Sequence, residues 1–349
     1  MIIGACGFGS TGSSVVSDYL MEFDSFQILD TIEFNWVYDV DGLIDLAYHV
    51  LNPHNRTKDS IVAIERYANR LNYIKSYYSR STATFELFEK EVMDFIDKIT
   101  SVSWYWTDLT YTKRSFIENK LRGRALASIK KQEKKSGVQL SSWPKKQVSY
   151  AAATRDFYEL AKQHVKNLLQ IIGAKGDKPL VIDQPFAGND PQAAFPYFDE
   201  PYAIIVDRDP RDNYIFLKTK LRGRNHFAPV NDVRDFVKYF RGIRDDQPYK
   251  KKSERILRMR FEDMVYDYDN ATAKLRGFLG LGENPRPKTV FDPALSIANT
   301  QTFLRFKNFD DDVKYIEEHL TEYLFDFSPY PEPDLSGEMF FGKSPLNRK

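Results

Sequence analysis

The sequence has 349 residues, of which 42% are hydrophobic and 28% charged, and its formal net charge is +1. A net charge this close to zero excludes a globally basic nucleic-acid-binding protein, and the length predicts one main domain with a large insertion, or two domains. No run approaches the roughly 18 apolar residues of a membrane span, and the first residues lack the pattern of a signal peptide.

Short apolar segments alternate with amphipathic ones over most of the chain. Strands are predicted at 1–6, 26–34, 179–183, 202–207 and 255–261. Helices follow or separate these strands at 13–23, 211–220, 231–243, 267–279 and 310–327. Strands that alternate with helices indicate a parallel sheet covered by helices. We therefore predict an α/β fold whose core is formed by residues 1–39 and 173–327.

Residues 40–172 have a different character. Apolar residues recur at three- and four-residue spacing over 59–78, 84–99 and 154–172, a pattern typical of amphipathic helices. We predict a largely helical insertion between the second and third strands. Residues 328–349 contain four prolines and two glycines and are predicted to form an extended tail.

The first predicted strand ends in the only cysteine, Cys6. A lone cysteine cannot form an internal disulfide, which fits a reducing compartment and predicts a cytoplasmic protein. The oligomeric state is left open by the sequence.

The first strand runs into GACGFGSTGSSVV (residues 4–16), in which Gly7, Gly9 and Gly12 form a G-x-G-x-x-G pattern. A strand, a glycine loop and a helix start bring several backbone N–H groups to one point, and the helix dipole favours an anion there. A dinucleotide fits the three glycines and Asp30, which lies 18 residues past Gly12.

Two other ligands use the same geometry. An ATP-type loop, G-x-x-x-x-G-K-[ST], is disfavoured because Ser13 stands where its lysine belongs. A compact tetrahedral anion is favoured by the hydroxyl groups around Gly12, which belong to Ser10, Thr11, Ser13 and Ser14. The loop alone does not decide between dinucleotide and anion, and a glycine turn without a ligand is the structural alternative.

A second candidate site follows the strand at 202–207. The segment AIIVDRDPRDNYIF (203–216) places Arg208 and Arg211 at the carboxyl edge of the sheet, where α/β proteins bind ligands. The planar guanidinium fork suits a phosphate. The structural alternative is a network of Arg and Asp side chains that caps the next helix.

Further along, RILRMRFEDMVYDYDNATAKLRGFLGL (255–281) is predicted to form a strand, a short acidic turn and a helix. Three motifs of this chain resemble those of the sulfotransferase family, which uses 3′-phosphoadenosine 5′-phosphosulfate, and they occur in the same order as in that family. They are the hydroxyl-rich loop, the strand that ends in R-D-P-R-D, and this R-F-E-D-M-V-Y-D…F-L-G-L segment. The closing segment TFLRFKNFDDDVKYIEEHLTEYLFDF (302–327) is similar to that of many carbohydrate sulfotransferases. The resemblance covers 1–35 and 180–327 and leaves the insertion unmatched.

The resemblance implies a P-loop-like core and a role for each matching position. The 5′-phosphosulfate corresponds to the N–H and hydroxyl groups of Gly9, Ser10, Thr11, Gly12, Ser13 and Ser14. The 3′-phosphate contact corresponds to Arg208, and Arg211 and Lys307 are further candidates for donor binding. No metal is expected, because no His/Cys/Asp spacing suggests one and in-line sulfuryl transfer does not require one.

Two positions depart from the family pattern. The family usually has Lys or Arg where this chain has Ser10, and that cation supports the bridging oxygen as charge develops on the leaving group. It also usually has Ser eight residues after the arginine, where this chain has Phe216. Arg211, Lys218 or Lys220 can replace the serine, whereas the missing cation predicts reduced or absent activity unless another cation reaches the site.

Three residues are candidates for the chemistry itself. Glu33, in LDTIEFNW, corresponds to the glutamate that carbohydrate sulfotransferases often use as the base, with a surface carboxylate as the structural alternative. His226 follows LRGRN near the expected anion site and is a rival base, whereas His164 and His319 are expected on helix surfaces. Ser10 completes the set because it occupies the position of the missing cation.

Residues 104–150 are aromatic and basic, with eleven Lys or Arg residues and two acids between Lys113 and Lys146. Aromatic faces stack on sugars, and basic side chains bind acidic glycans. Trp106, Arg122 and Arg124 are therefore candidates for acceptor binding, with a solvated helix face as the structural alternative.

The sequence thus predicts a sulfotransferase that acts on a hydroxyl acceptor, with a saccharide as the favoured acceptor. A catalytically silent relative that binds a nucleotide or an anionic glycan is the first alternative, favoured by Ser10 and Phe216. An NAD-dependent oxidoreductase is the second, and it depends on the three glycines and Asp30.

Overall fold

The computed structural model describes residues 1–29, 33–55, 57–77, 82–106, 124, 127–128, 131–137, 146–152, 156–219, 228–245 and 250–332. Contacts divide the chain into two compact units. The first contains Met1–Ile44 and Val165–Lys349, and the second contains Asp45–His164. The first unit holds both the glycine loop and Arg208.

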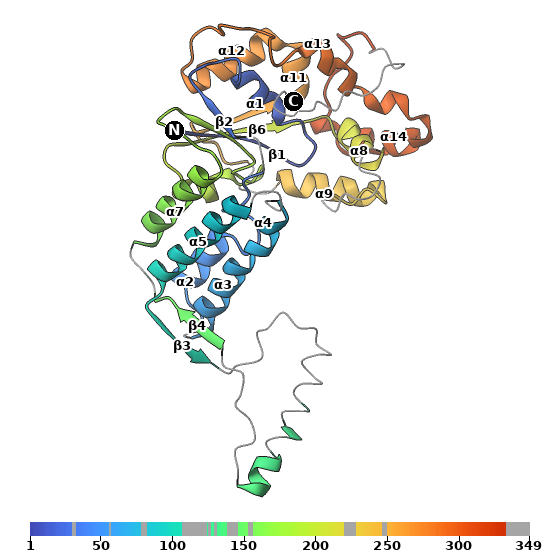
Figure 1. Cartoon of the computed structure of the whole chain (residues 1–349). Helices are drawn as coiled ribbons and strands as arrows, with labels where there is room; N and C mark the ends of the chain where they lie inside the picture. The colour runs from blue at the N-terminus through green and yellow to red at the C-terminus, as the bar shows by residue number, and fades with distance from the viewer. Residues whose placement is uncertain are drawn as a thin grey trace. The chain divides into compact units, whose positions relative to one another are not determined.

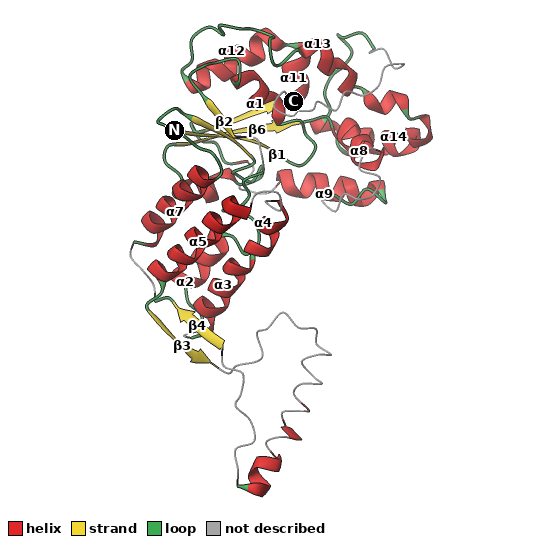
Figure 2. Cartoon of the chain, viewed as in Figure 1, coloured by secondary structure: helices red, strands yellow, loops and turns green. Residues whose placement is uncertain are grey.

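A five-stranded parallel sheet forms the centre of the first unit (Figure 2). Its strands are β1 (Ile2–Gly7), β2 (Gln27–Leu29), β5 (Leu180–Asp183), β6 (Pro201–Asp207) and β7 (Ile256–Arg260), in the spatial order β2-β5-β1-β6-β7. Each neighbouring pair is parallel. The predicted α/β class is therefore confirmed. The chain places β2 and β5 on one side of β1 and then crosses to β6 and β7 on the other side. Ligands bind at such a switch point, outside the carboxyl ends of the strands.

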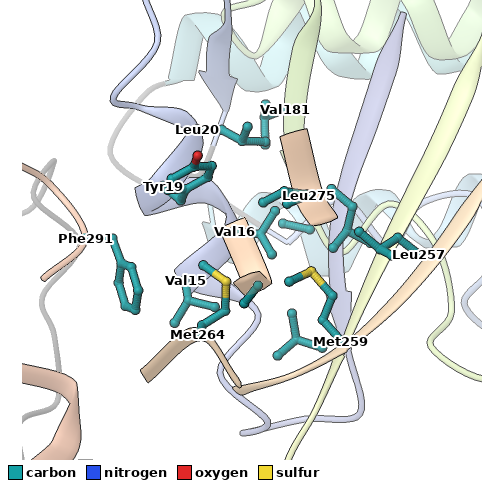
Figure 3. Packing of buried hydrophobic residues seen from close by; sticks show 14 of the residues in the cluster. Val15, Val16, Tyr19, Leu20, Val181, Leu257, Met259, Met264, Leu275 and Phe291 are labelled. Carbon is teal, nitrogen blue, oxygen red and sulfur yellow. The ribbon is translucent and has the colours of Figure 1, made fainter. Parts of the chain in front are cut away.

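One face of the sheet is covered by α1 (Ser14–Leu20), α11 (Phe261–Tyr266), α12 (Tyr268–Leu279) and the short α13 (Pro293–Ser296). Alternate residues of the strands point into this layer, and Figure 3 shows Leu257 and Met259 of β7 packed with Val16 of α1 and Leu275 of α12. These side chains are almost entirely buried. α12 ends at Gly280, whose φ of 67° is the left-handed conformation that glycine adopts most easily.

A second apolar cluster joins α8 (Pro210–Thr219), α9 (Val233–Asp245) and α14 (Asp310–His319), beside each other in Figure 1. The predicted helix at 310–327 is wrong in its length, because α14 ends at His319. Phe325 and Phe327 do not continue the helix; their rings pack against each other and against Tyr266 instead. Short 3₁₀ turns complete the unit at Pro191–Tyr197, Ile297–Asn299, Thr302–Arg305, Lys307–Phe309 and Thr321–Tyr323.

The second unit is mainly helical. It contains most of α2 (Leu43–Leu51), α3 (Lys58–Asn69), α4 (Leu71–Tyr77), α5 (Thr82–Ile99) and the first half of α7 (Phe157–Ile171). The predicted helix at 59–78 is two helices separated at Arg70. An antiparallel hairpin of β3 (Val102–Trp106) and β4 (Lys146–Tyr150) was not predicted from the sequence.

His164 corrects one expectation about the second unit. It was expected on a helix surface, but it is 1% exposed. Its Nε2 lies 2.6 Å from the Tyr67 hydroxyl and its Nδ1 lies 2.9 Å from a Glu91 oxygen, while the Phe95 ring stacks on it at 4.3 Å. His319 is exposed, as expected.

Candidate functional site

The glycine loop between β1 and α1 is held in shape by its own hydroxyl groups and by one residue from β5's end. The Phe8 N–H donates to Thr11 Oγ1 at 3.1 Å, and Thr11 is buried. The Gly7 N–H donates to Gln184 Oε1 at 3.2 Å, and Gln184 Nε2 donates to Ser13 Oγ at 2.9 Å. One side-chain amide therefore fastens the start of the loop to its end.

Positive φ angles give the loop its curvature. They occur at Gly9 (76°), Ser10 (58°) and Gly12 (87°), and at Ser10 this conformation is unusual for a residue with a side chain. A Cβ at Gly12 would also lie 2.6 Å from a carbon of the Phe261 ring. Gly12 is therefore required both by its backbone conformation and by the approach of α11. Ser14, the first residue of α1, is exposed.

Arg208 comes directly after β6 and reaches the loop. Its Nη1 donates to the Ser10 carbonyl at 3.4 Å and its Nη2 donates to the Asn299 carbonyl. The side chain is 5% exposed, and its guanidinium carbon lies 5.2 Å from the centre of the Phe261 ring and 5.7 Å from that of Phe216. Phe216 thus places an aromatic face beside the guanidinium, where the family resemblance leads us to expect a serine.

A second contact joins the same two segments. Asn213 of α8 donates from Nδ2 to the carbonyls of Gly9, at 3.2 Å, and Ser10, at 3.4 Å. Asn213 and Gln184 were not among the residues singled out from the sequence. The signal that could have found Gln184 is its place immediately after a strand, at the carboxyl edge of a parallel sheet.

Three carboxyl groups in the neighbourhood of Arg208 are fully shielded from water, those of Asp209, Asp212 and Glu262. Glu262 accepts a hydrogen bond from the Asp209 N–H at 2.9 Å, and Asp212 accepts from the Gln301 N–H at 2.8 Å. Burial raises the pKa of Glu262 to about 8, and the charge of Asp209 adds to this effect. Burial also raises the pKa of Asp212, against the opposing effect of Arg208.

Arg211 has partners within the protein for its guanidinium group. Its Nε and Nη2 donate to the two carboxylate oxygens of Asp209, at 3.0 and 2.8 Å, and its Nη1 donates to Glu317 at 2.8 Å. A further bond goes to the Phe325 carbonyl at 3.1 Å. These contacts tie α8 to α14 and to the chain that follows it. Lys307, the other candidate from this part of the sequence, is exposed in the 3₁₀ turn Lys307–Phe309.

Glu33 lies at the same edge of the sheet as the glycine loop. The next residue, Phe34, donates its N–H to the Asp183 carbonyl at 2.9 Å, which places the backbone at Glu33 close to the end of β5. The Glu33 side chain is exposed, yet partial loss of water around its carboxyl group raises its pKa above the usual value. Segments following β1, β5 and β6 thus meet at one edge, with Glu33 next to them.

The remaining candidates are located only in part. His226, Arg122 and Asp30 lie outside the described residues. Trp106 ends β3, where only its backbone is described, and Arg124 is exposed in the second unit. Within the described part of the chain, no helix is long and apolar enough to cross a membrane, and no group of His, Cys, Asp and Glu has the arrangement of a metal site. The cytoplasmic location stays a prediction.

No protein-family model matches the sequence, and no curated protein matches it. Among solved structures, the chain is similar to a sulfotransferase domain from the curacin biosynthetic pathway, at 13% identity and a TM-score of 0.35 over 96% of this chain and 94% of that one. It is also similar to the sulfotransferase domain of the Synechococcus PCC 7002 olefin synthase, at 13% identity and a TM-score of 0.34 over 99% of this chain and 90% of that one. At this level of similarity, function has to be inferred from the residues of the site.

Proposed function

We propose that this protein is a sulfotransferase that moves a sulfuryl group from 3′-phosphoadenosine 5′-phosphosulfate to a hydroxyl group. The observation that carries the proposal is the contact between Arg208 and the glycine loop, in which Nη1 of Arg208 lies 3.4 Å from the Ser10 carbonyl oxygen. A single donor held at both ends requires the two motifs to be adjacent, and they are adjacent at the switch point of the sheet.

Each end of the proposed donor has a group that suits it. The loop turns through positive φ angles at Gly9, Ser10 and Gly12, and such turns direct successive N–H groups toward an anion, here the 5′-phosphosulfate. Arg208 is buried, and its Nε has no hydrogen-bond partner among the described residues. A buried donor without a partner in the described part of the chain can be satisfied by water or by a ligand, and we propose the 3′-phosphate for Arg208.

The proposed reaction is an in-line displacement at sulfur. The acceptor oxygen forms a bond to sulfur while the bond from sulfur to the bridging phosphate oxygen breaks, and adenosine 3′,5′-bisphosphate leaves. The proton of the acceptor hydroxyl passes to a base, for which we propose Glu33. Because the pKa of Glu33 is raised, its carboxylate is a stronger base than an ordinary glutamate.

Ser10 supports the alternative of a silent, nucleotide-binding relative. Its side chain supplies no cation to the leaving group, and removing one donor to developing charge costs about a hundred- to a thousandfold in rate. Arg208 is a cation in contact with the loop, but its contact is to the Ser10 carbonyl. Turnover and nucleotide binding therefore have to be measured separately.

A saccharide acceptor is supported only by the composition of the second unit. Trp104 and Tyr105 lie on β3, and Tyr105 is 67% exposed. Aromatic faces of this kind suit the apolar faces of sugars. We therefore propose that the acceptor carries a hydroxyl group and, more specifically, that it is a saccharide.

The proposal is tested first by binding. The thermal shift of the protein is measured with adenosine 3′,5′-bisphosphate, with ATP and with NAD. Enzyme activity is then measured as the transfer of labelled sulfate to a panel of hydroxyl acceptors. We expect stabilisation by the bisphosphate and transfer to at least one acceptor. Stabilisation by the bisphosphate without transfer would favour the silent relative, whereas stabilisation by NAD alone would favour an oxidoreductase.

The role of Glu33 is tested by Glu33→Gln. We expect kcat to fall by about a hundred- to ten-thousandfold, since general-base catalysis contributes on this order, while the affinity for the bisphosphate stays unchanged. In the unsubstituted protein, kcat is expected to rise with pH as Glu33 loses its proton, at a pH above the ordinary value of 4.5. Glu86→Gln, at an exposed position of α5, is the matched control. Equal kcat in both variants would remove Glu33 from the mechanism.

A further inference from the structure

A basic cavity lies beside the edge strand β7, in the first unit. Its volume is about 470 Å³, and it is lined by Lys250, Lys251, Lys252, Ser253, Ile256 and Arg258. Four of these residues carry a positive charge and none carries a negative one. Glu254, which follows Ser253 in the chain, is exposed, and the Asp245 carboxylate forms an ion pair with Lys250, at 3.8 Å from its ammonium nitrogen.

The wall of this cavity is a formed structure. Ser253 accepts hydrogen bonds from the N–H groups of Arg255, through its hydroxyl at 3.2 Å, and Ile256, through its carbonyl at 3.1 Å. These bonds shape the turn that leads into β7. Arg258 donates from Nη1 to the Gly188 carbonyl at 3.1 Å. One cation is therefore fixed in place, and the three lysines of the lining precede it in the chain.

The same contact connects Arg258 to the glycine loop, whereas the three lysines precede the amino end of β7 and the loop follows the carboxyl end of β1. A Cβ at Gly188 would lie 2.5 Å from the Gly7 carbonyl oxygen, so the two backbones touch. Arg258 thus reaches the loop through one intervening residue. None of the proposed donor contacts uses the cavity, because these come from residues 9–14 and Arg208.

We propose that this cavity is a second anion site, and that it binds a phosphate or sulfate ester already carried by the acceptor. The second half of this statement rests on the proposed sulfotransferase function. The lining carries four cations and no acid, and although Lys250 forms an ion pair with Asp245, an anionic ligand suits the cavity better than an uncharged one. Lysine ammonium groups, as mobile point charges, together with a fixed guanidinium suit the several oxygens of an ester anion. The volume exceeds that of one such group and leaves room for part of the molecule that carries it.

The test measures the affinity of the full chain for three probes. Saturating adenosine 3′,5′-bisphosphate is present throughout, so that the donor site is occupied. Heparin hexasaccharide offers sulfate esters, inositol hexakisphosphate offers phosphate esters, and maltohexaose offers neither. We expect one or both ester probes to bind and maltohexaose not to bind. The triple variant K250S/K251S/K252S is expected to lose at least tenfold in affinity for the ester that binds.

Two further variants separate a cavity from general surface charge. K90S/K238S/K314S removes three exposed lysines elsewhere and is expected to change the affinity less than twofold. Ile256→Trp fills the cavity without changing the charge and is expected to weaken binding about tenfold, with thermal unfolding as the check on folding. Equal losses in the two triple variants, or no effect of Ile256→Trp in a folded protein, would overturn the proposal.

The outcome is independent of the donor. Should the bisphosphate fail to bind, the sulfotransferase function fails, and the same probes without nucleotide still report on the cavity. Should the bisphosphate bind normally while neither ester probe depends on the three lysines, only the second anion site is wrong.

Discussion

Two buried polar clusters, one in each unit, differ in how completely their members are hydrogen-bonded. In the helical unit, both ring nitrogens of His164 have partners, Tyr67 and Glu91. In the sheet unit, Nε of Arg208 and one carboxyl oxygen of Glu262 have none among the described residues. Because unsatisfied buried groups are costly, the first cluster is explained by stability alone, whereas the second requires a ligand, a proton or water.

The largest expected effect is on nucleotide binding, and it comes from removing Arg208, the cation of the cluster in the sheet unit. Arg208→Gln is expected to weaken binding of adenosine 3′,5′-bisphosphate at least a hundredfold, about 2.7 kcal/mol, as measured by calorimetry. The reason is the loss of a buried guanidinium cation whose Nε has no partner among the described residues and is therefore available to the phosphate.

Loss of folding has to be separated from loss of binding, since Arg208 offsets the buried charge of Asp212. Arg208→Lys keeps the charge without the fork and is expected to retain the fold with weakened binding. Lys238→Gln, 78% exposed on α9, is the matched control. Unchanged affinity in a folded Arg208→Gln protein would show that Arg208 does not face the nucleotide.

In the helical unit, by contrast, removing His164 is expected to lower stability and to leave nucleotide binding unchanged. His164→Phe keeps a flat ring against Phe95 but removes the partner of Tyr67 and of Glu91, so we expect a loss of about 2 kcal/mol in the free energy of unfolding. Affinity for the bisphosphate should not change. The measurement is urea unfolding with tryptophan fluorescence. A large loss of nucleotide binding with little loss of stability would erase the distinction between the two clusters.

The smallest expected effect is the change in stability for a step of one pH unit, and here the two clusters have opposite signs. Burial lowers the pKa of His164 below its ordinary 6.5, although Glu91 opposes this, so its contribution to stability is present above pH 6.5 and lost as the pH falls below it. The pKa of Glu262 is raised from 4.5 to about 8, so the folded state holds a proton that the unfolded state releases, and stability declines as the pH rises through that interval.

Substitutions that remove each group should flatten the matching part of the profile. Glu262→Gln imitates the protonated carboxyl and is expected to abolish the decline between pH 4.5 and about 8, which is at most about 1.4 kcal/mol per pH unit. His164→Phe should abolish the loss on the acidic side. Unfolding free energies measured from pH 4.5 to 8 decide both, and identical profiles for Glu262→Gln and the unsubstituted protein would show that Glu262 is ionised in the fold.

Local patterns determined much of the architecture. The strands and the helices that cover them were predictable because side-chain periodicity and the glycine turn are properties of neighbouring residues. The hairpin at 102–106 and 146–150 was not, since its strands are paired across a long intervening stretch and its residues looked like a basic surface. The helix predicted at 310–327 was too long because Phe325 and Phe327 have apolar partners outside the helix.

The sequence alone determined that a hydroxyl-rich glycine loop and an arginine would stand at the ends of two strands, since strand order along the chain and residue type suffice for that. Only the tertiary structure decided which arginine reaches the loop: Arg208 touches it, while Arg211 is held by Asp209 and Glu317. It also decided that His164 is buried and that Gln184 fastens the loop. The physical reason is that hydrogen-bond partners for a buried polar group come from segments far apart in the sequence, and no local pattern records which segments meet.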